Sequence, residues 1–540
     1  MKYYNFRCGC SFPLRENGED LVFDIKKINQ DCPAVWNLLD KGLTTGVFQL
    51  ETETGKNWVQ KLKPRSIRDL AALGSILRPG CLNCKDSNNI SVTEHYCRRK
   101  NGQEEVTYPH PELEELLRET YGQNIYQEQS IEILKIIGGF DLVQADLARR
   151  GIGKKKAEII EEVRLLFLKK TQEIGKVSLE KAEEIFNLIK ASEKYSFNRS
   201  HAVAYAFITY WTAYQKVHSP LNFFVSKLRH AHYKQDSFEK ISDLVLDAKL
   251  FDIEVKLPDL RQKKPWFWTD KKLIYYGITN IKSVGKSSFD SIIEYITQAE
   301  QSLGKPLNDF SFLEFCIFCG WDISEKTSKL INAGALDFFK KTRAEMCYLF
   351  DTIKDLTKDV EFPNAKALYL EKKPKDFIEF FELAAKTTKQ GGICHSEKRA
   401  LVLQNKLKIL KEPVMSLRDT TDVIITTEED LLGVSITHDI NKFDSDTPCK
   451  DILNGKNTNS ILGVRIKSIY TNVIKTGNNK GREMAKIVIF DSTGTLTGLV
   501  FADTWEKMKP LVSEGQNILI KGQKQKDNNN FIVRELCQVI

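Results

Sequence analysis

The sequence carries, at residues 146–156, the stretch Asp146-Leu147-Ala148-Arg149-Arg150-Gly151-Ile152-Gly153-Lys154-Lys155-Lys156, whose last eight residues hold five cations and two glycines. An arginine can grip phosphate oxygens with two hydrogen bonds, and a lysine acts as a compact positive charge. Glycine lets a backbone come close to a ligand. The stretch therefore predicts a site for a triphosphate or a DNA backbone. The alternative is a solvated charged turn between two helices, because charge runs usually lie on the surface.

Length and composition are those of an ordinary soluble protein. The 540 residues exceed what one hydrophobic core supports, so about three or four domains are expected. Hydrophobic residues make up 41% and charged residues 28%, and no apolar run is long enough for a membrane span or a signal peptide. We therefore expect a cytoplasmic location and no membrane partner. The net charge of +8 is modest for this size and is informative only where cations cluster.

Apolar residues recur at helical spacing from about Arg65 to Leu228. Ser66 is placed to cap a helix that must end before Arg78-Pro79-Gly80, because proline restricts the residue ahead of it. Residues 195–201 form a polar turn ahead of an apolar helix that should be largely buried. The predicted helices are Cys32–Leu39, Ile67–Leu77, Pro111–Arg118, Ile125–Ile137, Leu179–Lys194 and Ala202–His218.

A glycine turn lies within Tyr276–Ser288, after Ile281 and Val284, and opens a new helix. This pattern is typical of a helix-hairpin-helix, in which backbone N–H groups at a helix N-terminus attract a phosphate without reading a base. A plain helical turn is the alternative. The DNA-binding candidates here are Lys282, Gly285, Lys286 and Ser287.

The last block, residues 426–540, changes to period-two alternation. An OB-fold, a five-stranded β-barrel, is predicted, and such barrels bind single strands through a basic groove and stacking aromatics. Its strands are Leu462–Ile469, Met484–Phe490, Leu496–Phe501, Asn517–Lys521 and Phe531–Leu536, with a helix over Thr504–Leu511. The DNA-binding candidates are Lys467 and Lys486, with Tyr470, Phe490 and Phe501, although a place in the barrel core is equally expected for these aromatics.

These patterns predict a multidomain, mostly α-helical protein with a C-terminal five-stranded β-barrel. The expected divisions are a cysteine-containing N-terminal add-on (1–23), a dense helical domain (24–230), a domain with the glycine turn (231–345), a lysine-rich helical linker (346–425) and the barrel (426–540).

Six stretches occur in order along the chain: Gly46-Val47-Phe48-Gln49-Leu50-Glu51, Leu77-Arg78-Pro79-Gly80, Ile125-Tyr126-Gln127-Glu128-Gln129, Arg149–Lys156, Phe197-Asn198-Arg199-Ser200-His201-Ala202-Val203-Ala204-Tyr205 and Ala333-Gly334-Ala335-Leu336-Asp337. In order and spacing they resemble the α subunit of bacterial DNA polymerase III, a C-family replicative polymerase. The resemblance covers about residues 24–540 and is most specific over 24–230. It implies a fingers domain at 24–230 and a helix-hairpin-helix, clamp-binding-like domain at 231–345.

In that family the fingers bind the incoming nucleotide, with paired arginines and the following lysines near its phosphates. By position, the resemblance implies nucleotide contacts for Arg149, Arg150, Lys154, Lys155, Lys156, Arg78, Tyr126, Gln127, Asn198, Arg199, Ser200 and His201. His201 has the alternative role of a helix-start residue that satisfies backbone groups, and Ser200 is a natural N-cap.

The resemblance begins at the fingers. Phosphoryl transfer to a primer 3′-hydroxyl needs two metal ions held by carboxylates, and the family carries these in a palm domain ahead of the fingers. No Pro-Asp-x-Asp palm sequence precedes the matching part. We therefore expect no catalytic residue in this chain, and we expect the chain to be inactive without a partner. Mg²⁺ is expected to be held mainly by a palm-bearing partner chain, as in a split polymerase.

The expected function is one part of a DNA-directed DNA polymerase, a nucleotidyltransferase of DNA replication that acts on dNTP and primer–template DNA in a bacterial or phage-infected cell. One alternative is an inactive DNA-binding or clamp-associated protein derived from a polymerase, and another is a truncated fragment. The retained Arg149–Lys156 favours the polymerase, because a mere DNA binder has no use for a nucleotide element. A sliding clamp is implied only weakly, since Gln404–Ile409 lacks the family's terminal aromatic and is expected to be a plain helix.

Twelve cysteines without a secretory signal favour thiols or metal ligands over disulfides. Cys8-Gly9-Cys10 with Cys81 and Cys84, and with His95 and Cys97 nearby, supplies enough ligands for a structural zinc site that would fasten the N-terminal segment to the fingers. The pattern is loose, so ordinary thiols are the alternative.

Overall fold

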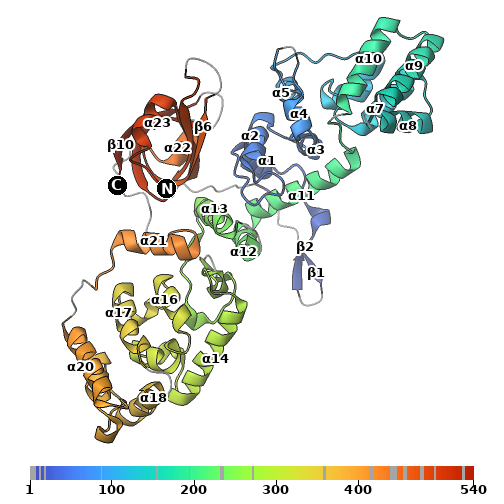
Figure 1. Cartoon of the computed structure of the whole chain (residues 1–540). Coiled ribbons are helices and arrows are strands. Elements are labelled where there is room, and N and C mark those ends of the chain that lie inside the picture. The colour runs from blue at the N-terminus through green and yellow to red at the C-terminus, as the bar shows by residue number, and fades with distance from the viewer. Residues whose placement is uncertain are drawn as a thin grey trace. The chain divides into compact units, whose positions relative to one another are not determined.

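The computed structural model describes the chain except residues 1–7, 11–13, 18–19, 87, 154–155, 194, 232–235, 271–272, 357–360, 413–416, 438–446, 454–458, 475–478, 492–493, 526–529 and 540. It divides into two compact units, Asn5–Pro220 and Leu221–Ile540, and each is considered by itself (Figure 1). The chain is mostly α-helical and carries a C-terminal barrel, so the predicted fold class is confirmed. Across the described residues, no helix combines the length and apolarity needed to cross a membrane.

The first unit has an antiparallel hairpin of β1 (Leu14–Asn17) and β2 (Asp20–Phe23), where the sequence predicted only an irregular add-on. Its α-helices are α1 (Pro33–Asp40), α2 (Glu53–Leu62), α3 (Ile67–Ile76), α4 (Pro79–Asn83), α5 (Val92–Lys100), α6 (Glu114–Leu117), α7 (Gln127–Gly138), α8 (Leu142–Gly153), α9 (Ala157–Ile174), α10 (Leu179–Ser192) and α11 (Arg199–His218).

Capping side chains determine where helices α3 and α11 of this unit begin. The Ser66 hydroxyl accepts a hydrogen bond from the Asp69 N–H at 3.2 Å, which confirms the predicted cap of α3. Two predicted bounds were wrong. The helix expected over Pro111–Arg118 is divided between 3₁₀ turns and the short α6. Helix α11 begins at Arg199 rather than Ala202, because the Asn198 side chain accepts from the His201 N–H at 2.9 Å and caps it earlier.

Helices α7 to α10 surround an apolar core centred on Phe167, which is fully buried and lies 5.8 Å, centroid to centroid, from Phe186. The cationic stretch is part of this assembly, because Gly151 lies inside α8. A Cβ atom on Gly151 would come within 2.9 Å of Cγ2 of Ile159 on α9. The glycine therefore allows α8 and α9 to pack closely, a role that the sequence had assigned to the approach of a ligand.

The second unit contains helices on either side of a small three-stranded sheet that the sequence did not predict, because its strands are only three residues each. Following α12 (Pro220–Ala231) and α13 (Ser237–Leu250) come β3 (Glu254–Lys256), β4 (Trp268–Asp270), β5 (Leu273–Tyr275), α14 (Lys286–Leu303), α15 (Phe312–Phe315), α16 (Ser324–Asn332), α17 (Arg343–Lys354), α18 (Glu361–Lys372), α19 (Phe377–Ala384), α20 (Glu397–Lys411) and α21 (Thr421–Leu432).

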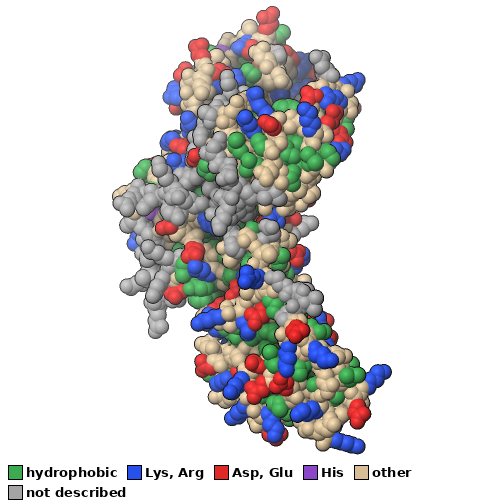
Figure 2. Space-filling view, turned by 90° about the vertical axis from the view of Figure 1, so that its left-hand side faces the viewer, with side chains coloured by type: hydrophobic (Ala, Val, Ile, Leu, Met, Phe, Trp, Pro, Cys, Tyr) green, Lys and Arg blue, Asp and Glu red, His purple; other side chains and the backbone are tan. Residues whose placement is uncertain are grey.

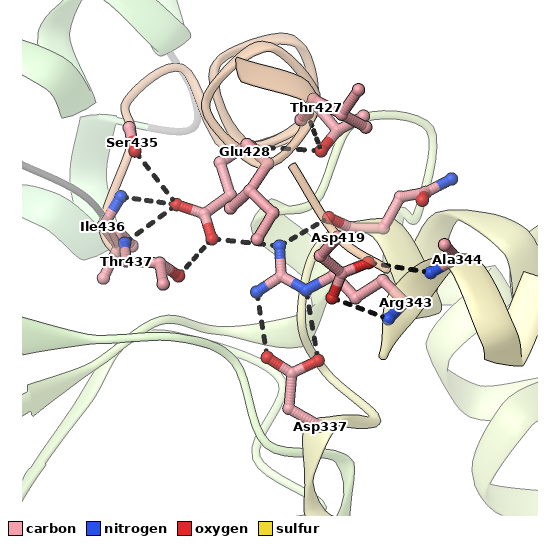
Figure 3. Close-up of polar contacts among 12 residues, drawn as sticks. Asp337, Arg343, Ala344, Asp419, Thr427, Glu428, Ser435, Ile436 and Thr437 are labelled. Carbon is pink, nitrogen blue, oxygen red and sulfur yellow. Dashed lines mark hydrogen bonds and ion pairs between the residues drawn. The ribbon is translucent and has the colours of Figure 1, made fainter. Parts of the chain in front are cut away.

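A buried ion network holds α17 to α21 (Figure 3). The Arg343 guanidinium donates to the Asp337 carboxylate at 2.9 and 3.1 Å and pairs with Glu428 at 3.0 Å. Glu428 also accepts from the backbone N–H groups of Ile436 and Thr437 at 2.7 and 2.9 Å. Arg343 and Glu428 are buried and are satisfied by each other and by neighbouring groups, as a buried ion pair requires, whereas Asp337 is 41% exposed at the edge of the network. It joins the Ala333–Asp337 stretch to a helix about ninety residues away.

The barrel confirms the strand predictions. Strands β6 (Ser460–Val473), β7 (Glu483–Asp491), β8 (Gly494–Val500), β9 (Asn517–Lys524) and β10 (Asn530–Val539) close in the order β10-β8-β7-β6-β9, and α23 (Ala502–Met508) lies between the third and fourth (Figure 1). All neighbouring pairs are antiparallel except β8 with β10. Alternate side chains such as Ile487 and Ile489 fill the interior, as period-two alternation requires.

Candidate functional site

A cavity of about 340 Å³ lies between α3 and α11 in the first unit. Its lining comes from three of the stretches quoted above and from the two helices. The lining residues are Gln49, Leu50, Leu70, Leu73, Gly74, Leu77, Arg78, Phe197, Ala202, Tyr205, Ala206 and Thr209. The fold therefore brings together, in one hollow, stretches that lie up to about 150 residues apart.

A row of aromatic rings and one cation, called the wall below, includes the cavity-lining residues Arg78, Phe197 and Tyr205. The Arg78 guanidinium lies 4.5 Å from the Phe197 ring centroid. Phe197 meets the His201 ring edge-on at 5.2 Å, and His201 lies over Tyr205 at 4.1 Å. Tyr205 in turn contacts Phe48 at 5.4 Å. Arg78 and His201 are exposed, so the wall offers a planar cation and an imidazole to a ligand.

The start of α11 is held by a carboxylate. Glu128 accepts from the Asn198 side-chain amide at 2.9 Å and from the Arg199 backbone N–H at 3.0 Å. A carboxylate at a helix N-terminus is favourable because it meets free N–H groups and the positive end of the helix dipole. The Ser200 hydroxyl donates to the Asn198 side chain at 2.7 Å, so Asn198, and not Ser200, is the cap. The His201 ring stacks on its neighbours rather than capping the backbone.

Tyr126 and Gln127 stand at the start of α7, beside the segment that leads into α11. The Gln127 N–H donates to the Phe197 carbonyl at 3.0 Å, which fixes the two segments side by side. Tyr126 is buried, and burial raises the pKa of its phenol well above the ordinary value, so it stays neutral. Arg199 lies 5.7 Å from the Tyr126 ring and pairs with Glu119 at 2.6 Å. These residues position the cavity edge, and Arg199 is already paired within the protein.

Arg149 and Arg150, near the C-terminal end of α8, have different surroundings. Asp146 accepts from Arg149 at 3.2 Å and from Arg150 at 2.8 Å. The Arg149 side chain is 16% exposed and lies 3.8 Å from the buried Glu193 carboxylate, whereas Arg150 is 65% exposed. Burial raises the pKa of Asp146, but hydrogen bonds from both arginines outweigh it and the net pKa is lowered. Arg149 thus ties α8 to the end of α10, and Arg150 is the arginine able to reach a phosphate.

The lysines that follow are only partly described. Lys154 and Lys155 lie outside the described residues, and Lys156 is exposed at the N-terminus of α9. Elsewhere, on the face drawn in Figure 2, lysine and arginine side chains are interspersed with aspartate and glutamate. On that face, cations do not gather into a patch of one sign.

In the second unit, α14 begins directly after Gly285, as predicted. The element ahead of it is a 3₁₀ turn, Ile278–Asn280, and the helix-hairpin-helix stays a prediction. A Cβ atom on Gly285 would meet nothing within 4 Å, so a ligand can approach the backbone there. The predicted cations are engaged: Lys282 pairs with Asp430, and Lys286 with Asp290. Ser287, in the first turn, is exposed.

The barrel separates the three candidate aromatics. Phe490 is 9% exposed and packs against Leu246, whereas Tyr470 and Phe501 are 56% and 48% exposed. Lys486 is exposed and lies directly opposite Tyr470 across the β6–β7 pair. Tyr470, Lys486 and Phe501 therefore lie on the outside of β6, β7 and the end of β8, the side that OB-folds use for oligonucleotides.

Lys467, by contrast, is occupied. Its ammonium pairs with Asp243 at 3.1 Å and with Glu239 at 3.5 Å, both on α13. The predicted plain helix over Gln404–Ile409 is confirmed, since these residues lie inside α20.

The cysteines group differently from the predicted pairing. Among the described residues, Cys8 and Cys10 lie with Cys32 rather than with Cys81 and Cys84. The Cys81 thiol instead faces the Ser75 carbonyl at 3.8 Å, inside α3 and α4. His95 is held by Glu104 at 2.8 Å and Asp86 at 3.2 Å, which leaves it outside the group. Cys316 and Cys319 are fully buried, as expected for core residues.

Comparison with known proteins shows which proteins this chain is similar to. Residues 13–175 match the family described as the bacterial DNA polymerase III alpha subunit finger domain. DNA polymerase III subunit alpha of Aquifex aeolicus is 33% identical over 534 residues, which are 96% of this chain and 40% of that protein. The same subunit of Bacillus subtilis is 30% identical over 529 residues, 96% of this chain and 42% of that protein. Over almost its whole length, the chain is similar to DNA polymerase III subunit alpha. It spans about two fifths of the length of the relatives it matches.

Of the residues that line the cavity, only Arg78 was predicted as a site residue. Gln49, Phe197 and Tyr205 also line it and lie inside stretches that resemble DNA polymerase III alpha, and that place in a shared stretch was the available signal. Glu128, which holds the start of α11, lies in such a stretch too. Glu119 had no signal, because its partner Arg199 is 80 residues away.

Proposed function

We propose that this chain supplies the nucleotide-binding fingers and DNA-binding elements of a replicative DNA polymerase, and that it works with a separate palm-bearing chain. The palm would hold Mg²⁺ with its carboxylates and carry out nucleotidyl transfer to a primer 3′-hydroxyl. In this division of labour the present chain binds and orients the dNTP and grips the primer–template.

One observation carries the proposal: three of the six stretches that resemble DNA polymerase III alpha converge on the cavity between α3 and α11. The wall beside that cavity exposes the Arg78 guanidinium over Phe197 and the His201 ring over Tyr205. Planar rings and a planar cation suit a base or sugar face, and a cation suits a phosphate. Arg150, which is 65% exposed, lies on the same unit as the cavity.

Two features of the second unit support a grip on DNA. The open backbone at Gly285 and the exposed N–H groups of the first turn of α14 suit a phosphate of the duplex. Tyr470, Lys486 and Phe501 outside the barrel suit a single strand, because bases stack on exposed rings beside a cation. Both contacts would be independent of base sequence.

Primer extension tests the proposal. The chain alone should not extend a primer in Mg²⁺ and dNTP, and adding a palm-bearing chain from the same genome should restore extension. Extension by the chain alone would refute the assignment of the metal-binding carboxylates to a partner. Binding of primer–template without extension in the presence of every palm-bearing chain of that genome would favour an inactive DNA-binding protein instead.

A further inference from the structure

Four potential metal ligands meet at one end of α11. The sulfur atoms of Cys8, Cys10 and Cys32 lie within 4.8 Å of one another. Cys8 Sγ is 3.5 Å from Cys32 Sγ. The Nε2 atom of His218 lies 3.8 Å from Cys8 Sγ and 3.3 Å from Cys32 Sγ. All four residues belong to the first unit and come from three separate segments of the chain.

These separations fit the edges of a zinc tetrahedron. With Zn–S bonds of about 2.3 Å and a Zn–N bond of about 2.0–2.1 Å, tetrahedral angles put two sulfurs about 3.8 Å apart and a sulfur about 3.6 Å from the nitrogen. The Cys8–Cys32 distance of 3.5 Å and the two His218 distances of 3.8 and 3.3 Å are close to those values. His218 lies against the Cys8–Cys32 edge, so an ion would draw His218 and Cys10 toward each other.

The surroundings favour ligation. Cys32 is fully buried and immediately precedes the first turn of α1, so the helix start holds its thiol in one place. A divalent ion would stabilise the thiolates directly.

Neighbouring groups orient two of the thiols. The Asn29 side-chain amide donates to Cys10 Sγ at 3.2 Å. The Cys32 N–H donates to the Tyr210 hydroxyl at 3.1 Å, and that hydroxyl donates to the Asn29 carbonyl at 2.8 Å. Such outer contacts commonly fix the ligands of structural metal sites. The Tyr214 ring, 4.1 Å from that of His218, holds the imidazole in place.

We propose that Cys8, Cys10, Cys32 and His218 form a structural zinc site. It fastens the Cys8–Cys10 segment to the start of α1 and the end of α11. All four positions are filled by protein ligands, which is the arrangement of a structural zinc and leaves no open position for a substrate. Its effect on the nucleotide cavity is indirect, because the cavity is lined by the other end of the same helix.

Metal analysis of the full chain, purified under reducing conditions, tests the site. Elemental analysis should find about one zinc per chain. X-ray absorption should show three sulfur neighbours at about 2.3 Å and one nitrogen at about 2.0–2.1 Å. This measurement needs no variant, so it remains decisive if a ligand substitution prevents folding. A wild-type chain free of zinc after growth with added zinc overturns the proposal, as does titration of two fewer thiols, which would indicate a disulfide.

Substitutions then assign the ligands. Cys32→Ser and His218→Gln should each lower zinc content about fivefold or more after dialysis against a chelator. The matched control is the double change Cys81→Ser with Cys84→Ser, which should leave zinc content unchanged. In the cobalt-loaded protein, His218→Gln should keep the thiolate-to-metal absorption while shifting the bands of tetrahedral Co²⁺. Loss of zinc in the control, or full retention in both ligand variants, would place the metal elsewhere and overturn the assignment.

Discussion

Replacing Arg150 by alanine should weaken dNTP binding while leaving the first unit folded. The Arg150 side chain is 65% exposed, and its partner Asp146 is shared with Arg149. An exposed ion pair of this kind contributes about 0–1 kcal/mol to stability. The variant should therefore melt within a few degrees of the wild-type chain.

The cost to nucleotide binding follows from the hydrogen bonds that an alanine side chain cannot donate. A hydrogen bond to a charged group is worth about 1.5–3 kcal/mol, so Arg150 would contribute up to about 3 kcal/mol to phosphate binding. Freeing the guanidinium from Asp146 costs up to about 1 kcal/mol. The net loss of about 2 kcal/mol corresponds to about a 30-fold rise in the KM for dNTP. This value applies to the enzyme reconstituted with a palm-bearing chain.

Two comparisons make the test sharp. Arg118→Ala is the matched control, because Arg118 is 60% exposed and pairs with Glu115 at 2.7 Å on the helix surface. Arg149→Ala should instead destabilise the unit by about 1–3 kcal/mol, since it leaves the buried Glu193 without its cation. Steady-state kinetics and thermal melting separate the three. If Arg150→Ala raised the KM no more than Arg118→Ala does, Arg150 would not be a nucleotide ligand. If Arg150→Ala weakened dNTP binding and duplex binding equally, Arg150 would be assigned to a contact with the DNA backbone instead.

Three further predictions concern the second unit. Arg343→Ala should destabilise it by about 3–5 kcal/mol in urea unfolding, because the buried Glu428 loses its cation, whereas Lys341→Ala on the surface should cost under about 1 kcal/mol. Equal effects of the two variants would contradict the network. Burial raises the pKa of Glu429 to about 7, so the stability that its bound proton contributes is fully present below the unfolded-state pKa of 4.5 and is lost as the pH rises through about 7. Relative to Glu429→Gln, the wild type should be more stable at pH 5.5 than at pH 8. A stability difference between the two proteins that does not change with pH would refute this. Tyr470→Ala should weaken single-stranded DNA binding about tenfold and Tyr470→Phe hardly at all, as measured by fluorescence anisotropy. Equal affinities of the two variants would show that the Tyr470 ring does not contact DNA.

Local patterns predicted the parts of this protein that local forces decide. Ser66 was identified as a cap because an N-cap needs only a hydroxyl three residues before a free N–H. The barrel strands were found because inward and outward side chains alternate along each of them. The same alternation does not tell the inside of the barrel from a contact outside it. Phe490, packed against Leu246, and Tyr470, exposed, were therefore indistinguishable from the sequence.

The contacts that the sequence missed join distant segments. Cys32 and His218 are separated by 186 residues, and no spacing rule links a helix start to the end of another helix. Arg343 and Glu428 are 85 residues apart for the same reason. A CxxC pair is conspicuous in a sequence, so Cys81 and Cys84 were preferred as zinc ligands over a single cysteine. Packing of α1 against α11 determines which cysteines lie together, and this tertiary packing cannot be inferred from spacing along the sequence.

Charge around Arg149 and Arg150 is more nearly balanced than five cations in eight residues suggest. Asp146 is shared by the two arginines, and Glu193 lies behind Arg149. Arg150 also stands in the last turn of α8, where a cation offsets the helix dipole, so the fold has its own use for it. A phosphate must compete with these contacts for each arginine. The free-energy cost of breaking them is small only for a highly exposed cation. The free energy of nucleotide binding should therefore depend on Arg150 far more than on Arg149, although the sequence presents the two as equivalent.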